Sequence, residues 1–214
     1  MVNMKYVDHL LTVNPLEAQE HRIEGRKAIH CCSGFHESLS YPIEDEKYKC
    51  DVSAVITNLY TDDIWDRKQQ VVGRKELLDR LYADESINLH VYGPESIGAV
   101  YPRAYRGFAP YDICCRIFSN SRVNLCISPI TIPHYFSERA PQIIGSGGLL
   151  ATDTEIGNTL IPSRDYVLLD NGAYETIKGL LVNEDKRAEI ARNGYVKREC
   201  LSWKRFGELL KTLM

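Results

Sequence analysis

The order of apolar and polar positions along the chain becomes regular after residue 50. Short β-branched or apolar runs alternate there with segments of helical period. Within residues 74–84, Leu77, Leu78 and Leu81 recur at the spacing of one helical face, which predicts a helix. Alternation of strands with helices favours a parallel sheet wrapped by helices, the doubly wound architecture. The strands are expected over 52–60, 88–93, 123–129 and 166–170, and further helices over 109–121 and 202–213.

The first 49 residues follow a looser pattern. Residues 4–13 predict a short buried strand, and a polar helix that ends at Gly25 is expected after it. The charged and turn-rich stretch 41–51 is typical of a linker. We therefore predict an α/β chain with a short N-terminal extension or crossover segment over 1–49. Residues 50–214 are expected to form a Rossmann-like domain with a doubly wound parallel sheet.

Composition and charge exclude several classes of function. The chain has 214 residues, of which 44% are hydrophobic and 26% charged, and its net charge is -3. Such a surface has no general attraction for nucleic acids or acidic membranes, and no apolar run approaches the roughly 18 residues of a membrane span. The first residues lack the layout of a signal peptide, so we expect a cytoplasmic protein. The seven cysteines form no C-x-x-C pair, and we expect reduced thiols rather than a zinc site.

The stretch HYFSERAPQIIGSGGLLATD, residues 134–153, opens like a helix and ends like a buried strand. In a doubly wound sheet the start of such a helix faces the ligand crevice, where its free N–H groups suit a phosphate. Arg139 could donate a fork of hydrogen bonds to a diphosphate, and Glu138 could accept hydrogen bonds from sugar hydroxyls. Equally, Ser137 and Glu138 could serve as an N-cap and as a first-turn acid. The glycines at 145–148 are typical of a helix end and a sharp turn.

The order of these motifs resembles that of a known family. The chain reads VYG, a loop with YRGF and PYD, a helix, SRVNLCIS, YFSERAPQIIGSGGLLATD, YVLLD and a basic last helix. This order resembles the carboxyl-terminal half of GT-B glycosyltransferases, and specifically the group similar to the spore-maturation protein CgeB. The resemblance covers residues 50–214 and is most specific over 134–153. It implies a domain that binds a nucleotide-sugar donor, whose sugar moves to an acceptor held by the amino-terminal half.

The resemblance also implies roles for single residues. The loop 128–138 would face the donor sugar and the diphosphate, and Arg139 stands at the family's arginine. Gln142 occupies the position of a family glutamate that accepts hydrogen bonds from the ribose, and it can still accept and donate, although without the charge. Glu138 could instead supply the missing carboxylate. His134 and Glu138 are the candidate catalytic residues, and His134 could equally be a hydrogen-bonded residue at the helix entry.

Two further loops complete the expected donor site. The loop after VYG would border the base, where Tyr105 or Phe108 could stack; a solvated arginine-rich loop is the alternative. The loop after the strand 52–60 should also face the crevice, because it leaves the same edge of the sheet. The expected donor-binding residues are Ser137, Glu138, Arg139, Gln142, Asn58, Arg106 and Gly107.

These observations predict a glycosyltransferase, or the donor-binding half of one. It would transfer a hexose or pentose from a nucleotide sugar to a glycan or glycoconjugate acceptor, with no cofactor beyond that donor. No Asp-x-Asp pair occurs, so we expect no metal site and a metal-independent reaction. The alternative is a non-catalytic nucleotide-sugar or glycan-assembly module with the same fold. A dehydrogenase is disfavoured because no G-x-G-x-x-G follows the first strand of the domain.

Chain length limits this assignment. Two GT-B halves need far more than 214 residues, so we expect a fragment whose acceptor-binding half is a further domain, a reduced protein, or a chain whose acceptor half comes from a partner. In that architecture the terminal helix reaches toward the other half. We therefore expect the helix 202–213 to lie apart from the main layer of the sheet. Its apolar stripe of Trp203, Phe206, Leu209, Leu210 and Leu213 should be buried.

Overall fold

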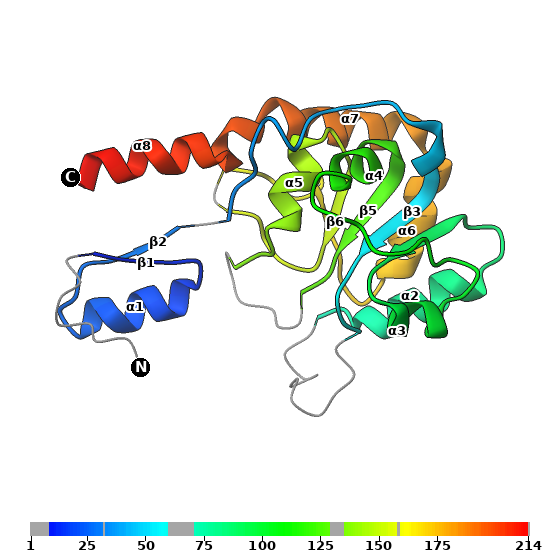
Figure 1. Cartoon of the computed structure of the whole chain (residues 1–214), viewed down its shortest axis with the longest axis horizontal. Coiled ribbons are helices and arrows are strands. Elements are labelled where there is room, and N and C mark those ends of the chain that lie inside the picture. The colour runs from blue at the N-terminus through cyan, green and yellow to red at the C-terminus, as the bar shows by residue number, and fades with distance from the viewer. Residues whose placement is uncertain (1–8, 32, 60–70, 129–134, 158, 214) are drawn as a thin grey trace.

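A parallel sheet of five strands forms the centre of the molecule, in the order β4-β3-β5-β6-β7 (Figure 1). The computed structural model describes residues 9–31, 33–59, 71–128, 135–157 and 159–213. The helices around this sheet make the fold mixed α/β, which confirms the predicted fold class. The strands are β3 (Cys50–Val55), β4 (Leu89–Tyr92), β5 (Ser121–Cys126), β6 (Leu150–Thr152) and β7 (Val167–Leu168).

The chain changes its direction across the sheet between β3 and β5. It passes from β3 to β4 on one side, returns past β3 to β5, and then continues outward through β6 to β7. The register places Ala54 beside Leu125 at this point. Because β4 and β6 lie on opposite sides of the pair β3 and β5, the strand order reverses between these two strands, which makes their carboxyl ends a topological switch point. Ligands of doubly wound sheets usually bind there.

Helices cover both faces of the sheet and enclose two apolar cores. One core contains Leu81 and Ile177, and the other contains Ile117 and Ile143, all of which are fully buried. Such double cover allows the strands to be apolar on both faces. The first face carries α2 (Arg74–Ala83) and α6 (Ala173–Val182), and the second carries α4 (Cys114–Asn120) and α5 (Arg139–Gly145). Next to β4 lies α3 (Glu95–Val100), and α7 (Glu184–Val196) contacts both α5 and α6.

The boundaries of two elements differ from the sequence prediction. The helix predicted over 109–121 begins only at Cys114, because the amide of Ile113 closes a turn onto the carbonyl of Pro110. The following strand starts at Ser121, two residues before the predicted start. The short helix α3 was not predicted, since its six residues include a glycine and cover less than two turns.

The glycines after α5 serve turn geometry and packing, as predicted. Gly147 has a φ of +75°, a left-handed conformation that ends a helix readily only with glycine. A Cβ atom on Gly148 would lie 2.5 Å from the carbonyl oxygen of Phe118. These glycines therefore let the chain turn from α5 into β6 beneath α4, and they do not form a phosphate loop.

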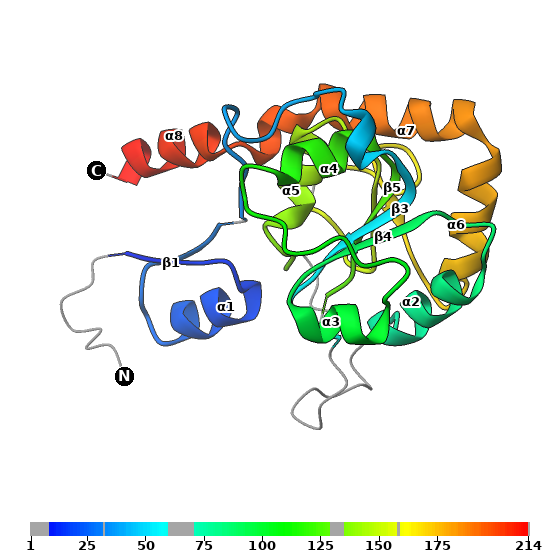
Figure 2. The same cartoon turned by 45° about the vertical axis from the view of Figure 1, so that its right-hand side comes forward.

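The N-terminal residues form a small unit of their own beside the main sheet (Figures 1 and 2). β1 (Leu10–Thr12) and β2 (Ala28–His30) pair in parallel, and α1 (Pro15–Ile23) connects them. Asn14 caps α1, because its Oδ1 accepts a hydrogen bond of 3.0 Å from the amide of Leu16. β1 covers part of the predicted strand 4–13, whose residues 4–8 lie outside the described chain.

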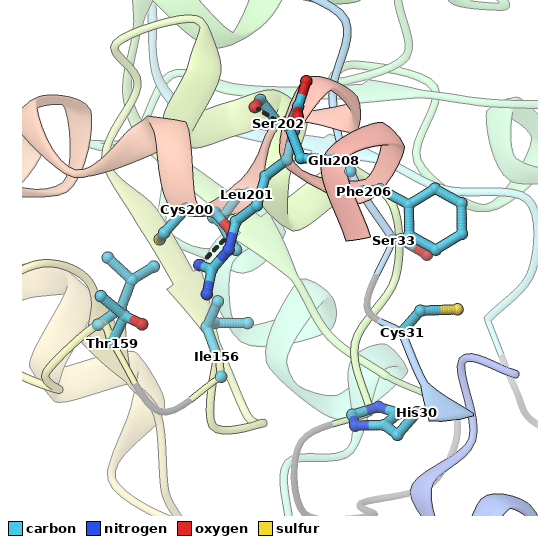
Figure 3. Close-up of a pocket in the computed structure, with 14 residues that line it drawn as sticks. His30, Cys31, Ser33, Ile156, Thr159, Cys200, Leu201, Ser202, Phe206 and Glu208 are labelled. Atoms are coloured by element: carbon cyan, nitrogen blue, oxygen red, sulfur yellow. Dashed lines mark hydrogen bonds between the residues drawn. The ribbon is translucent and has the colours of Figure 1, made fainter. Parts of the chain in front are cut away.

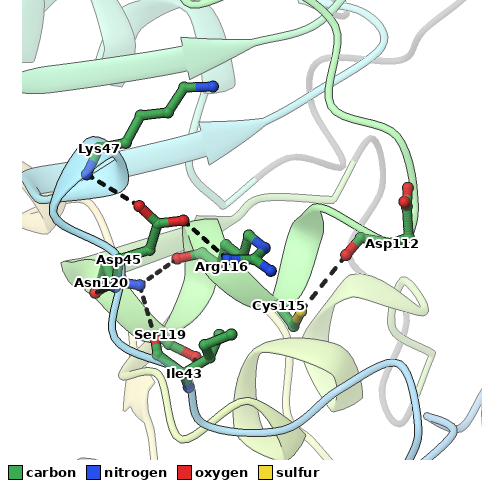
Figure 4. A network of polar contacts seen from close by, with 8 residues as sticks. All are labelled: Ile43, Asp45, Lys47, Asp112, Cys115, Arg116, Ser119 and Asn120. Atoms are coloured by element: carbon green, nitrogen blue, oxygen red, sulfur yellow. Dashed lines mark hydrogen bonds and ion pairs between the residues drawn. The ribbon is translucent and has the colours of Figure 1, made fainter.

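The segment between this unit and β3 is attached to α4 by a polar network (Figure 4). The side chain of Asn120 accepts a hydrogen bond from the amide of Asp45 at 2.9 Å and donates one to the carbonyl of Ile43 at 2.8 Å. Arg116 pairs with the carboxylate of Asp45 at 2.9 Å. The stretch that was expected to be a linker is thus fixed onto the second face of the main unit. The domain boundary at residue 49 stays a prediction.

The terminal helix α8 (Trp203–Leu213) runs away from the sheet toward the N-terminal unit (Figure 1). Its expected separation from the main layer is therefore confirmed. The expectation of a buried stripe is wrong for the described side chains, since Trp203 is 38% exposed and Phe206 and Leu210 are half-buried. The side chains of Leu209 and Leu213 lie outside the description. No helix among the described residues is long and apolar enough to cross a membrane.

Candidate functional site

A buried arginine joins the two strand exits at the switch point. Arg74, the first residue of α2, is 2% exposed. Its Nη1 donates a hydrogen bond of 2.6 Å to the carbonyl of Asn58, beyond β3, and its Nη2 donates to the carbonyl of Ile127, beyond β5. A charged donor shared by two carbonyls stabilises both chain segments in one arrangement. Arg74 therefore links the segments that follow β3 and β5 at the switch point.

Arg139 adds a second guanidinium at the same place. Its Nη1 donates a hydrogen bond of 3.0 Å to the carbonyl of Val55, the last residue of β3. Its Nε is buried and has no hydrogen-bond partner among the described residues. Both arginines also act on the thiol of Cys126 at the end of β5, because burial raises the pKa of that thiol and the charges of Arg139 and Arg74 oppose the rise. Two positive charges thus surround the carboxyl end of β5.

One buried acid lies within reach of the charge of Arg74. Asp153 directly follows β6 and is 3% exposed. Its Oδ1 accepts a hydrogen bond of 2.9 Å from the amide of Ser128, and Thr154 donates to the Ser128 hydroxyl oxygen at 3.3 Å. Burial raises the pKa of Asp153 to about 6, against the opposing effects of the Ser128 hydrogen bond and the charge of Arg74. The carboxyl ends of β5 and β6 are therefore joined by hydrogen bonds in which the titratable carboxyl group of Asp153 takes part.

Ser137, Glu138 and Gln142 lie around the start of α5, together with a tyrosine. The amide of Arg139 donates to Ser137 Oγ at 3.4 Å, so Ser137 serves a local turn. Glu138 is exposed and makes no capping hydrogen bond. Gln142 is 3% exposed. The pKa of Tyr111 is raised by burial and then by Glu138, while a hydrogen bond with Gln142 opposes the rise, so Tyr111 brings these side chains into one cluster.

The other predicted donor-binding residues lie apart from this cluster. Asn58 lines the switch point through its carbonyl. The segment with Arg106 and Gly107 follows the edge strand β4, where the amide of Arg106 donates to the carbonyl of Val91 at 2.9 Å. The charge of Arg106 helps to lower the pKa of His90 to about 4, after burial as the main cause. The charge of Arg106 therefore affects His90 of β4, and the contact of Arg106 with the base of a nucleotide stays a prediction.

Some predictions cannot be placed. His134, one of the two candidate catalytic residues, falls within 129–134, which lies outside the described residues. Glu138 is placed, but no described residue gives it a partner that defines a catalytic role. The catalytic assignments thus stay predictions.

Sequence reasoning missed the three residues that organise the site. Arg74 stands in a polar segment that begins an amphipathic helix, so its charge suggested solvent. Asp153 resembled an ordinary polar residue at a strand end, and Tyr111 lay in the PYD motif without an assigned role. A signal for Arg74 and Asp153 existed in their positions, since each directly borders a buried element at the carboxyl edge of the sheet.

A separate cavity lies between the N-terminal unit and α8 (Figure 3). Its volume is ≈ 570 Å³, and its lining includes Cys31 after β2, Ile156 after β6, and Cys200, Arg205 and Phe206 near the start of α8. Burial raises the pKa of both the Cys31 and the Cys200 thiols, so neither is activated as a nucleophile. The cavity therefore lies where the small unit meets the main one, and the switch point is elsewhere.

The described residues include no group of three or more histidine, cysteine, aspartate or glutamate side chains placed to hold a metal ion. The six described cysteines are free thiols.

Comparison with known proteins links this geometry to one family. Residues 67–211, well over half of the chain, match the model of a family described as glycosyl transferase-like. No curated protein matches the chain at a significant level. Among solved structures, sucrose-phosphate synthase from Thermosynechococcus elongatus superposes with a TM-score of 0.69 at 16% identity, over 98% of this chain and 59% of that chain.

Two further structures share the fold. A point mutant of TarM from S. aureus, in complex with fondaparinux, α-GlcNAc-glycerol and UDP, gives a TM-score of 0.69 at 11% identity, covering 99% of this chain and 44% of that one. HepE of Anabaena, in complex with UDP and glucose, gives 0.65 at 12% identity, covering 96% and 62%. At sequence identities this low, the superpositions show a similarity of fold alone. The chain spans less than two thirds of the length of each of these three proteins.

Proposed function

The chain belongs to the glycosyl transferase-like family, and from this premise we propose that it is the donor-binding half of a glycosyltransferase. It binds a nucleotide sugar at the switch point between β3 and β5, and the sugar passes to a glycan or glycoconjugate acceptor. Solved proteins with the same fold contain UDP and, in one case, UDP-glucose. A uridine diphosphate sugar is therefore the first donor to test.

The convergence of Arg74 and Arg139 on the carboxyl ends of β3 and β5 carries this proposal. A diphosphate brings two negative charges, and guanidinium groups in a partly desolvated crevice attract them more strongly than in water. Arg74 is fully buried and contributes through its field and through the shape of the crevice. Arg139 is half-buried and stands at the rim, where it can face the diphosphate.

The ribose would lie one helical turn along α5, near Gln142. The Gln142 amide lies close enough to the Tyr111 hydroxyl to oppose the rise in the pKa of Tyr111. A ribose hydroxyl can join such a pair, because both groups donate and accept. Glu138, exposed and next to Tyr111, is then the nearest carboxylate to the sugar hydroxyls. Ser137 and Asn58 border the crevice, and the segment with Arg106 and Gly107 would meet the base from β4.

The acceptor half would complete the sheet that β1 and β2 begin. Parallel sheets are stable when helices or further strands cover both faces. Within β1, α1 and β2, Ala18 and Ala28 are the residues that reach the buried class, while Leu16 and Ile23 are 51% and 78% exposed. An acceptor-binding half with parallel strands, in the same polypeptide or in a partner chain, would cover these side chains.

Finer features of the proposal follow from the resemblance stated above. The transferred sugar is a hexose or pentose, the reaction needs no metal ion, and the nucleotide sugar is a substrate with no separate cofactor. The protein acts in the cytoplasm and is most similar to the CgeB-like group. A buried carboxylate at Asp153 has one oxygen without a partner among the described residues, yet a lone carboxylate is a poor magnesium site.

Titration of a panel of uridine, guanosine, adenosine and thymidine diphosphate sugars by calorimetry tests the proposal. At least one donor should bind, and Arg139→Ala should weaken its binding by about 1.5–3 kcal/mol, the value of a charge-assisted hydrogen bond. Arg122→Ala is the matched control, because Arg122 pairs with Asp51 at the opposite edge of the sheet. Absence of binding by every donor, with and without added Mg²⁺, would reject the proposed function.

A further inference from the structure

Asp153 is the buried acid whose chemistry the proposed function leaves unused. Its Oδ1 accepts a hydrogen bond from the amide of Ser128, which follows β5 by two residues. Thr154, the next residue, donates to the hydroxyl oxygen of the same serine. On the other side, Arg74 holds the carbonyl of Ile127. The residues that follow β5 are therefore held by two side chains, the carboxyl group of Asp153 and the guanidinium of Arg74.

The second carboxyl oxygen of Asp153 has no such contact. Its Oδ2 is buried and makes no hydrogen bond with any described residue. A buried carboxylate oxygen without a donor is costly, and the cost falls when the group takes up a proton. Burial accordingly raises the pKa of Asp153 to about 6, which places the change of charge close to neutral pH.

The groups that face Asp153 decide how its charge responds to a ligand. Ser128 and Cys126 face it from β5 and its exit, Arg74 faces it from α2, and Arg139 of α5 acts on Cys126. The charge of Arg74 stabilises the ionised carboxylate directly. The two arginines are also the groups that a diphosphate would approach in the crevice. A ligand that neutralises them would remove the field that keeps Asp153 ionised.

We propose that Asp153 is a proton-linked positioning residue of the donor site: its carboxyl group holds the exit of β5 and takes up one proton when an anionic donor binds. In this step the carboxylate accepts a proton from solvent on Oδ2, and the Oδ1 hydrogen bond to Ser128 is kept. No other bond forms or breaks. This inference rests on the proposed function, because it needs a diphosphate at the switch point.

The sign of the effect follows from linkage. A bound dianion disfavours the ionised form of Asp153, so binding raises the pKa of this group above its value in the free protein. Affinity must then increase as the pH falls through the range between the two pKa values. Each unit of pKa increase corresponds to about a tenfold change in affinity. For an increase of about half to one unit, donor affinity should rise roughly 3- to 10-fold between pH 8 and pH 5.5.

The experiment measures protons directly. UDP-glucose, or whichever nucleotide sugar of the panel binds, is titrated into the wild-type chain by calorimetry at pH 6.5 in buffers of different ionisation enthalpy. The diphosphate diester of a nucleotide sugar does not titrate near this pH, so any proton taken up enters the protein. Wild type should take up a fraction of a proton per bound donor, and its affinity should follow the pH dependence given above.

Two variants test whether the proton that is taken up on donor binding enters Asp153. Asp153→Asn keeps an oxygen that can accept from the Ser128 amide and removes the titration, so proton uptake should vanish and affinity should become independent of pH. Asp170→Asn is the matched control, because this exposed acid lies beyond β7 at the same edge of the sheet and its carboxylate accepts a hydrogen bond from the amide of Gly172. It should behave like wild type. Carbon-13 NMR of labelled aspartate carboxyls gives a second readout on the wild type, in which a titration midpoint near 6 should move upward with bound donor.

Some results would contradict the inference about Asp153 alone, and a different result would contradict the proposed function as well. If a donor binds with the same affinity and no proton uptake from pH 5.5 to pH 8, Asp153 is a structural residue alone and the inference is wrong. The same conclusion follows if Asp153→Asn folds and still takes up the proton, or if no carboxyl midpoint moves in the NMR titration. If no nucleotide sugar binds the wild type at any pH, the proposed function fails, and the inference fails with it.

Discussion

The molecule repeats one connection, strand to helix to parallel strand, in two regions of opposite character. In the main unit, β3, α2 and β4 enclose Val52, Leu81 and Val91, which are all fully buried. In the N-terminal unit, β1, α1 and β2 make the same connection, yet all three residues of β1 are only half-buried. The comparison shows that strand pairing alone does not make a core. A core needs cover on both faces, and the described residues do not provide it for the N-terminal unit.

The two regions are also held together by different interactions. The N-terminal unit depends on local contacts, such as the Asn14 cap and the bond of 2.6 Å from Arg22 Nε to the carbonyl of Ala28. The main unit depends on apolar packing and on buried charge, with Arg74 as the clearest case. Substitutions of the same kind should therefore have very different effects in the two regions.

The largest difference is expected between two arginines that both bind carbonyls. Arg74→Met leaves the carbonyls of Asn58 and Ile127 without their charged donor inside the protein, which should lower the free energy of unfolding by about 3–5 kcal/mol. Arg22→Met removes a bond at an exposed side chain of α1 and should cost less than about 0.5 kcal/mol. Urea unfolding followed by circular dichroism measures both.

A loss at Arg74 no larger than that at Arg22 would contradict the comparison. In that case the strand exits at the switch point would be held by apolar packing and not by the guanidinium. The Arg74→Lys variant separates charge from geometry, because lysine keeps the charge and loses the fork. It should fall between wild type and Arg74→Met.

The next effect concerns the pH dependence of stability. The folded pKa of Asp153, about 6, is raised from an ordinary value of 3.8, so its stabilising contribution belongs to the protonated form. That contribution is complete below pH 3.8 and is lost as the pH rises through 6. The Asp153→Asn variant cannot ionise, so its stability relative to wild type should increase by about 2–3 kcal/mol between pH 4 and pH 7.5.

Asp165 provides the opposite case in the same fold. It is also fully buried, but Arg164 and Lys197 pair with it, and these partners lower its pKa. Its contribution is present above the unfolded pKa and is lost as the pH falls, so Asp165→Asn should be most destabilising near neutral pH. Parallel pH profiles for the two variants would contradict both assignments.

A smaller effect is expected at two glycines. Gly148→Ala would place a Cβ atom 2.5 Å from the Phe118 carbonyl oxygen and should cost about 1–3 kcal/mol, because backbone must move. Gly25, at the end of α1, has a φ of +78° and open space around it. Gly25→Ala should cost about 1 kcal/mol of local strain, confined to the N-terminal unit. Hydrogen exchange of the strand amides would show whether the cost reaches β3.

The sequence predicted the main unit better than the site inside it. Periodicity located α2 within one residue, since Leu77, Leu78 and Leu81 must share one face, and the strand positions followed from β-branched runs. The glycine turn after α5 was also correct. The order of the strands needed the architecture rule and was not visible in any single segment.

The buried polar groups were the part that sequence could not reveal. The sequence around Arg74 and Asp153 places them at the carboxyl edge of the sheet, but it does not show that they are buried, since burial depends on the packing of elements distant in sequence. Gln142 was singled out through a family pattern, and the influence of its side chain on Tyr111 only through the structure. Charged residues adjoining buried elements at the carboxyl edge are therefore the positions to examine first in such sheets.

The smallest effect is expected where apolar side chains of the N-terminal unit face solvent. Leu16→Ser and Ile23→Ser alter positions that are 51% and 78% exposed, so each should change the free energy of unfolding by less than about 0.5 kcal/mol. Leu81→Ala, fully buried beneath β3 and β4, is the reference and should cost about 2–5 kcal/mol. A side chain that is largely exposed to water has little buried apolar surface to lose, so its substitution changes the free energy of unfolding only slightly. A loss near 2 kcal/mol at either α1 position would show that the unit is covered in solution. Sedimentation at several concentrations would then identify the cover, since a second copy of this chain gives a concentration-dependent mass and packing within one chain does not.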